Sequence, residues 1–265
     1  MANLFAGHKD EWKTLATIDY FGMFVKAYIP FNAWMNVNYP TLNTDREKIN
    51  EIKKNPNTFR DGICSLFNAR NQRGNAFRSL LGELHELLEA CYINNQNHRI
   101  TFTNVVLGKN NNNLATNSWR GIGFRVQYGI GNTHQTDSLI KNKAGNAIFH
   151  LSQNDYNIED LKNNADFINK VNPNYQSLLL DCYNQVCPYL HANFTIGYDV
   201  NDSSSFIECG SYKFINEPEN IAKGIIEILY NLRNSLFHGE LIPNEDANRV
   251  YGAAYRILFE LIQPL

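Results

Sequence analysis

Three polar residues near the end of a predicted helix have the side-chain types needed for proton transfer on a phosphodiester. Arg233, Asn234 and His238 lie in the stretch NLRNSLFHGE. Histidine titrates near neutral pH and can move a proton to or from a sugar oxygen, whereas arginine keeps its charge and donates forked hydrogen bonds to phosphate oxygens. A 2′-hydroxyl nucleophile is already next to its phosphorus, so this chemistry needs no metal ion. These three residues are therefore the candidate catalytic group.

The spacing of the three residues decides which of their side chains can interact on a helix. Residues five apart lie about 140° around the helix axis, so Arg233 and His238 do not share a face. Asn234 and His238 are four apart and do share one, which would let the amide fix the orientation of the imidazole. Arg233 has a long side chain, which can reach round the helix or across to the same helix of a second copy.

Two other patterns resemble catalytic or metal motifs, and we interpret both as structural. Arg78 and His85 have a similar arginine–histidine spacing, but Ser79 and not an asparagine follows Arg78. The stretch HELLE at 85–89 begins like the zinc-binding HExxH motif, but Glu89 stands where the second histidine would lie. No phosphate-binding glycine loop of the Walker type occurs. The sequence therefore predicts neither a metal site nor a cofactor.

The hydrophobic periodicity predicts a mainly α protein. Apolar residues recur at helical spacing over most of the chain, whereas residues 97–153 alternate and are bounded by glycine, which favours strands. Pro30 is expected to kink or break the first helix. The expected fold is a helical bundle with a small β-rich insertion at about 97–153, all in one domain spanning residues 1–265. The predicted helices lie at residues 9–38, 44–54, 57–69, 74–93, 157–171, 172–194 and 218–238, with a last helix after Asn244.

The motif and its setting resemble the HEPN superfamily of ribonucleases and nucleotide-binding domains. Its signature is an arginine, a polar residue, three to five further residues and a histidine, which here is Arg233-Asn234-Ser-Leu-Phe-His238. The motif ends the penultimate predicted helix, Gly239 follows the histidine, and a last helix comes next. The run FGMFVKAYIPFNAWM is similar to the long first helix of some members. The β-rich residues 97–153 depart from the compact family bundle.

The resemblance implies a metal-independent endoribonuclease that leaves 2′,3′-cyclic phosphate and 5′-hydroxyl ends. It implies Arg233 as the phosphate contact, His238 as general acid or base, and Asn234 as the polar residue that orients them. It also implies a homodimer through the Arg233/His238 face and a role in antiviral defence or as a toxin, with an antitoxin or defence protein as a further partner. Two alternatives stay open: a non-catalytic HEPN module that binds nucleotide, RNA or a protein, and a helical scaffold in which the motif is incidental.

The overall charge argues against a protein that binds nucleic acid through a uniformly basic surface. The formal net charge is −2 and the pI is about 6.4. Local basic groups could still contact RNA, with Trp34, Trp119 or Tyr128 stacking on bases. Further basic residues of this kind are Lys141 and Lys143. The other candidate RNA-contacting residues are Arg70, Arg73, Lys26 and Asn32.

The cysteines and the N-terminus predict a cytoplasmic protein. There are five cysteines, an odd number, and no CxxC pair. The first residues, MANLFAGHKDEW, lack the pattern of a signal peptide. No uninterrupted apolar run reaches the roughly 18–20 residues that a membrane helix requires. We therefore expect free thiols in a reducing compartment and no membrane partner.

Overall fold

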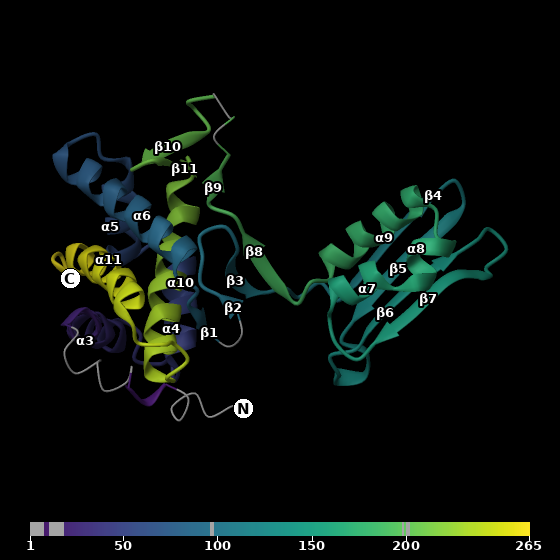
Figure 1. Ribbon diagram of the computed structural model, residues 1–265, viewed down its shortest axis with the longest axis horizontal. Helices are drawn as coiled ribbons and strands as arrows, with labels where there is room; N and C mark the ends of the chain where they lie inside the picture. The colour runs from purple at the N-terminus through teal and green to yellow at the C-terminus, as the bar shows by residue number, and fades with distance from the viewer. Residues whose placement is uncertain (1–7, 11–18, 96–97, 198, 200–201) are drawn as a thin grey trace. The chain divides into compact units, whose positions relative to one another are not determined.

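The computed structural model describes residues 8–10, 19–95, 98–197, 199 and 202–265 (Figure 1). The chain divides into two compact units. The first, here called the helical unit, combines Met1–Leu107 with His191–Leu265, and the second, here called the sheet unit, is Gly108–Leu190. The sheet unit is thus inserted between two segments that together build the helical unit. All five cysteines are free thiols.

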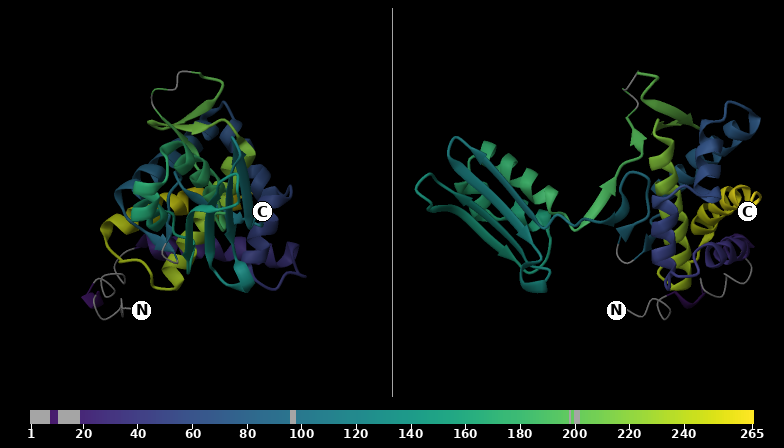
Figure 2. Two further views of the ribbon diagram at one scale, coloured as in Figure 1. Left: turned by 90° about the vertical axis from the view of Figure 1, so that its right-hand side faces the viewer. Right: turned by 180° about the vertical axis from the view of Figure 1, so that it is seen from behind.

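The helical unit is built around α10, α11 and α3. Helix α11 packs on α3 and α6, whereas α10 packs on α4 and α5 (Figures 1 and 2). The shared core is rich in aromatic side chains and includes the fully buried Phe24, Phe31 and Tyr251. The helices described are α3 (Asp19–Asn38), α4 (Asp45–Lys54), α5 (Thr58–Asn68), α6 (Gln72–Ala90), α10 (Pro218–Phe237) and α11 (Glu245–Ile262).

Side-chain caps explain where most of these helices begin. Thr44 and Glu47 form a capping box at the start of α4, in which the Thr44 hydroxyl accepts from the Glu47 N–H and the Glu47 carboxylate accepts from the Thr44 N–H. Asparagine side chains cap α5, α6 and α11, at Asn57, Asn71 and Asn244. These signals are local in sequence, and the helices predicted at these places are confirmed.

A kink or a break was expected at Pro30, and the break does not occur, because helix α3 continues through this residue. The helix runs from Asp19 to Asn38, and residues 11–18 of the predicted first helix lie outside the described part. Proline removes one helical N–H donor, which leaves the Lys26 carbonyl without its usual partner. Lys26, Ile29 and Pro30 are all on the exposed side of α3, where solvent can satisfy that carbonyl.

The sheet unit is an antiparallel four-stranded meander with helices on one face (Figure 1). Its own core contains Phe124, Val126, Ile140, Leu179 and Tyr183, all buried. Three helices follow the sheet in the chain and cover this apolar side. The elements are β4 (Leu114–Trp119), β5 (Ile122–Tyr128), β6 (Thr136–Lys141), β7 (Ala147–Gln153), α7 (Ile158–Asn163), α8 (Ala165–Lys170) and α9 (Pro173–Gln185).

The prediction of a mainly α fold was wrong, because the protein is a mixed α/β protein whose described residues form four sheets. The helix expected at 172–194 ends at Gln185, before Pro188, and the chain then enters strands. A hairpin formed by residues 206–215 follows further along the chain, and Gly210 supplies its turn with φ +61°. The remaining strands are β1 (Asn94–Asn95), β2 (His98–Arg99), β3 (Val105–Lys109), β8 (Tyr189–Ala192), β9 (Thr195–Ile196), β10 (Phe206–Cys209) and β11 (Tyr212–Ile215).

The close approach of α6 to β10 gives a first prediction. A Cβ atom on Gly82 would lie 2.1 Å from the Cys209 carbonyl oxygen, whereas a Cβ on Gly62 of α5 would meet nothing within 4 Å. Gly82→Ala should therefore destabilise the protein by roughly 1–3 kcal/mol. Gly62→Ala should stabilise it by up to about 1 kcal/mol through helix propensity. Urea unfolding of both variants tests this, and a Gly82→Ala midpoint at or above wild type would refute it.

Candidate functional site

The motif predicted from the sequence lies at the C-terminal end of α10, where Arg233 is held from three sides. Its Nη1 donates to Asn234 Oδ1 at 2.9 Å, and its Nη2 is 3.2 Å from Asp45 Oδ2 on α4. The guanidinium lies over the Phe237 ring at 4.7 Å and is 5.9 Å from the centre of the Tyr28 ring on α3. The side chain is 24% exposed, so its orientation is fixed while part of it stays accessible.

Asn234 positions Arg233 and not His238. Its side chain is buried and accepts from the guanidinium, while its backbone carbonyl accepts the His238 N–H at 2.9 Å. The expected side-chain contact between Asn234 and the imidazole therefore does not form. His238 is the C-cap of α10 and is exposed, and no described residue bonds its ring. The imidazole is thus free to meet a substrate at the same helix end that holds Arg233.

The Tyr28 hydroxyl lies beside this arginine as a buried group. Burial raises the pKa of Tyr28 far above its usual range, and the charge of Arg233 opposes this only in part. Neither Tyr28 Oη nor Arg233 Nε has a hydrogen-bond partner among the described residues. Tyr28 therefore remains a neutral phenol, and unused hydrogen-bonding capacity is concentrated around the guanidinium.

A buried ion-pair network fixes α4 against α10 and so places Asp45 at Arg233. Glu227 is only 2% exposed, and its carboxylate is 2.6 Å from Arg46 Nη1 and 2.5 Å from Lys53 Nζ. Desolvation lowers the pKa of Lys53, and the Glu227 charge opposes that shift. Arg46 also lies over the Tyr230 ring at 4.3 Å. Sequence reasoning missed this network, although a glutamate inside the apolar stripe of α10 was a visible signal.

The four predicted RNA-contacting residues are scattered over the helical unit. Lys26 and Arg70 are exposed, and Arg73 is paired with Glu260, its Nη2 lying 2.9 Å from the carboxylate. Asn32 is half-buried, and its Oδ1 has no partner among the described residues. No described contact joins any of the four to the motif on α10.

The second arginine–histidine pair has structural contacts. Arg78 Nη1 donates to the carbonyls of Phe67 and Ala69, at 2.8 and 2.7 Å, and so closes the end of α5. His85 is buried and packs edge-on against the Tyr212 ring, with centroids 4.6 Å apart. The two side chains therefore serve different parts of the core, as expected for the structural interpretation.

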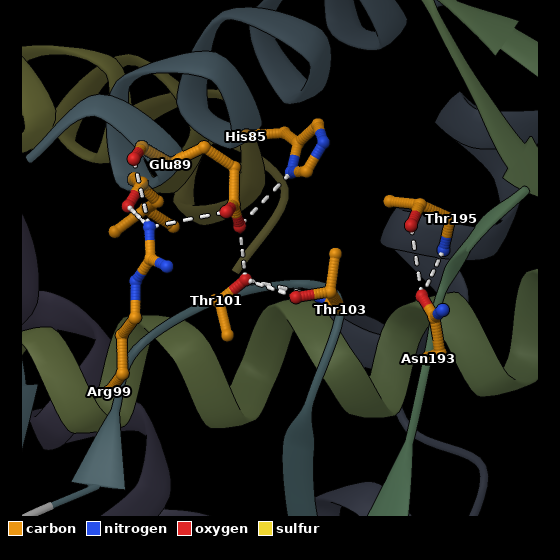
Figure 3. Close-up of polar contacts among 8 residues, drawn as sticks. His85, Glu89, Arg99, Thr101, Thr103, Asn193 and Thr195 are labelled. Carbon is orange, nitrogen blue, oxygen red and sulfur yellow. Dashed lines mark hydrogen bonds and ion pairs between the residues drawn. The ribbon is translucent and has the colours of Figure 1, made fainter. Parts of the chain in front are cut away.

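Glu89 is the centre of a polar cluster that closes the end of α6 (Figure 3). Its carboxylate accepts from the Thr101 hydroxyl, is 3.1 Å from Arg99 Nη2 and is 4.0 Å from His85 Nδ1. Arg99 also donates to the carbonyls of Leu88 and Glu89. Within the described ranges, no three His, Cys, Asp or Glu side chains come close enough to hold a metal ion. This cluster ties β2 and its following loop to the helix end.

The burial of His85 gives a prediction for the pH dependence of stability. Desolvation lowers the pKa of His85 below its usual value of 6.5, against the opposing charge of Glu89. The folded protein therefore favours the neutral His85 ring. This contribution to the free energy of unfolding is present above pH 6.5 and is lost as the pH falls through the lowered pKa of His85. Between pH of about 7.5 and 5, wild type should lose more thermal stability than His85→Phe, which retains Glu89, Glu86 and Arg99. Parallel loss in both proteins would contradict this assignment.

A third cluster has the residue types of a hydrolase triad but not its geometry. In the sheet unit, Ser152 Oγ and His150 Nε2 both contact the same oxygen of Asp137, at 2.6 and 2.7 Å. The serine oxygen is 3.5 Å from that same ring nitrogen. A triad needs one ring nitrogen on the acid and the other on the nucleophile. This arrangement is therefore a surface hydrogen-bond network.

Comparisons with protein-family models, with curated protein sequences and with solved structures found no match. Among the helices that the structure describes, none is long and apolar enough to cross a membrane.

Proposed function

We propose that the protein is a metal-independent endoribonuclease whose site is the end of α10. The observation that supports this is the pairing of a fixed arginine with an unpartnered histidine. Arg233 is oriented by Asn234 and Asp45, and the exposed His238 imidazole has no bonding partner among the described residues. The resemblance of the Arg233-Asn234…His238 motif to HEPN ribonucleases assigns these residues to RNA and favours a role in defence or as a toxin.

In the proposed reaction, His238 takes the proton of a 2′-hydroxyl as that oxygen attacks the neighbouring phosphorus. The P–O5′ bond breaks, and the departing 5′-oxygen takes a proton, which yields a 2′,3′-cyclic phosphate and a 5′-hydroxyl. Arg233 stabilises the negative charge that develops on the non-bridging oxygens. One imidazole acts as the base, so a second copy can supply the acid from its own His238.

Exposed apolar side chains around the motif support a homodimer through this face. Phe237, which stacks under Arg233, is 56% exposed. On α3, Ile29 adjoins the buried Tyr28 and is 62% exposed. Large exposed apolar residues that gather near one site are typical of an interface. A two-fold axis here would bring two motifs together.

The Asp45–Arg233 ion pair favours a second candidate, a non-catalytic module that binds RNA, nucleotide or a protein. Asp45 partly neutralises the charge that a transition state would use, because its carboxylate lies 3.2 Å from Arg233 Nη2. A module that only binds would keep the arginine ordered in this way until a ligand phosphate or carboxylate replaces Asp45.

Incubation of the protein with a mixture of tRNA and unstructured RNA in EDTA separates the two candidates. The ribonuclease predicts fragments with cyclic-phosphate ends, from wild type but not from His238→Ala protein purified in the same way. Equal cleavage by both proteins would point to a contaminant or another site. Binding without cleavage by either protein would replace the ribonuclease with the binding module.

A further inference from the structure

Within the sheet unit, the segment that forms the sheet is basic and the segment that forms the helices is acidic. From Gly108 to Gln153 there are five lysines and arginines and a single acid, Asp137. From Asn154 to Leu190 there are two lysines and five acids. The near-neutral composition of the whole chain hides this separation. Because helices α7 to α9 cover one face of the sheet, the basic part of the unit is its open face and its turns (Figure 2).

The strand register places this charge on rows of the open face. Residues that face one another in paired strands form a row across the sheet, and their side chains point to the same side. The rows of the open face alternate with rows that contain the buried Phe124, Val126 and Ile140. Arg125 and Lys141 are exposed in adjacent rows. The open-face rows are Leu114–Gln127–Asp137–Ser152, Thr116–Arg125–Leu139–His150 and Ser118–Gly123–Lys141.

One end of this sheet carries a basic and aromatic group formed by two hairpin turns. Arg120 occupies the β4–β5 turn with φ +50°, and its guanidinium lies over the Trp119 ring at 4.5 Å. A Cβ on Gly121 would meet the Lys143 side chain at 2.4 Å, so Lys143 from the β6–β7 turn lies across this turn. Lys141 ends β6 beside it. Arg120, Lys141 and Lys143 are all exposed.

The one acid on the open face does not cancel this charge. Asp137 Oδ1 already accepts from Ser152 and contacts His150, so this carboxylate is partly engaged within the face. The remaining side chains are mostly amides, hydroxyls and cations, together with His150, the exposed Leu114 and the half-buried Leu139. A polyanion with planar, hydrogen-bonding groups complements such a surface, because cations bind its phosphates and the exposed Arg120 guanidinium can stack on its bases. A lipid surface or a hydrophobic protein segment would need more exposed apolar area.

We propose that the open face and the turn end of the sheet unit bind single-stranded RNA, through Arg120, Arg125, Lys141 and Lys143. The sheet unit is then the part of the chain that holds the RNA substrate. This role deepens the proposed ribonuclease function and rests on it. Binding is nevertheless measurable in protein that cannot cleave, so the two proposals can fail separately.

The test is fluorescence anisotropy with a labelled single-stranded RNA of about 20 nucleotides. Full-length protein carries His238→Ala so that the probe stays intact. Lys141→Gln/Lys143→Gln should weaken binding by about tenfold at low salt and reduce the slope of log K against log salt by about 1.4. The matched control is Lys162→Gln/Lys170→Gln. It removes the same charge from helices α7 and α8 of the sheet unit, where each lysine has an acidic partner. The control should bind within about twofold of the parent.

Three results would overturn the proposal. The first is equal RNA affinity in the Lys141/Lys143 double variant and the parent. The second is an equal loss in the Lys162/Lys170 control, which would show an effect of net charge alone. The third is displacement of the RNA by polyglutamate as readily as by unlabelled RNA, which would assign the face to an acidic protein segment. If RNA binds as proposed and wild type still does not cleave, the ribonuclease function fails and the RNA-binding face remains.

Discussion

Replacing His238 with alanine should lower the rate of RNA cleavage in EDTA by about 10²- to 10⁴-fold, the usual contribution of a general acid or base. The side chain is exposed at the C-cap of α10 and no described residue bonds its ring, so the substitution removes few folded-state contacts. Stability should change by less than about 0.5 kcal/mol. The loss of cleavage would then report chemistry and not unfolding.

A matched control for this substitution is His134→Ala in the sheet unit. His134 is also exposed, and its ring bonds the Tyr128 hydroxyl at 3.0 Å within the sheet unit. It should retain cleavage within about twofold, since it lies outside the reacting group. The variant Arg233→Lys tests the second residue of the site, because lysine keeps the positive charge of arginine but loses its forked donors. Cleavage by Arg233→Lys and by His238→Ala at the wild-type rate would refute the site.

Glu227→Leu should destabilise the helical unit by about 3–5 kcal/mol, the largest effect on stability that we expect from one substitution. The carboxylate is buried between Arg46 and Lys53, and the Lys53 side chain is itself only 6% exposed. Without Glu227, Lys53 must remain buried without its partner or lose its proton. Arg46 can turn to solvent, because 43% of its side chain is already exposed. Urea unfolding followed by circular dichroism measures the loss.

Two further variants show whether the cost comes from the unpaired lysine. Lys53→Met/Glu227→Leu should recover most of the stability, since replacing both members of a buried pair by apolar groups is often neutral. Glu260→Leu on α11 removes the half-buried partner of the exposed Arg73 and should cost no more than about 1 kcal/mol. If Glu260→Leu and Glu227→Leu have equal effects, the buried network does not stabilise the fold as described.

The sequence predicted those features that depend on neighbours within a few residues. The start of α4 follows from Thr44 and Glu47, and the end of α10 follows from His238 and Gly239, because caps and periodicity act over one or two helical turns. The positions of the principal helices and of strands β5 and β7 were predictable for the same reason. The hairpin that turns at Gly210 was not predicted, although glycine is a local turn signal.

Tertiary structure decided which side chains meet. The spacing allows the Asn234 side chain to bond either His238, four residues later, or the adjacent Arg233. Asp45 and Tyr28, which lie on other helices, contact Arg233 and fix it against the Asn234 amide. The Glu227 network and the open face of the sheet unit likewise join residues that are distant in sequence. Helical and strand periods are local properties, whereas these contacts depend on how whole elements pack, so the sequence alone determined the motif and only the fold determined its partners.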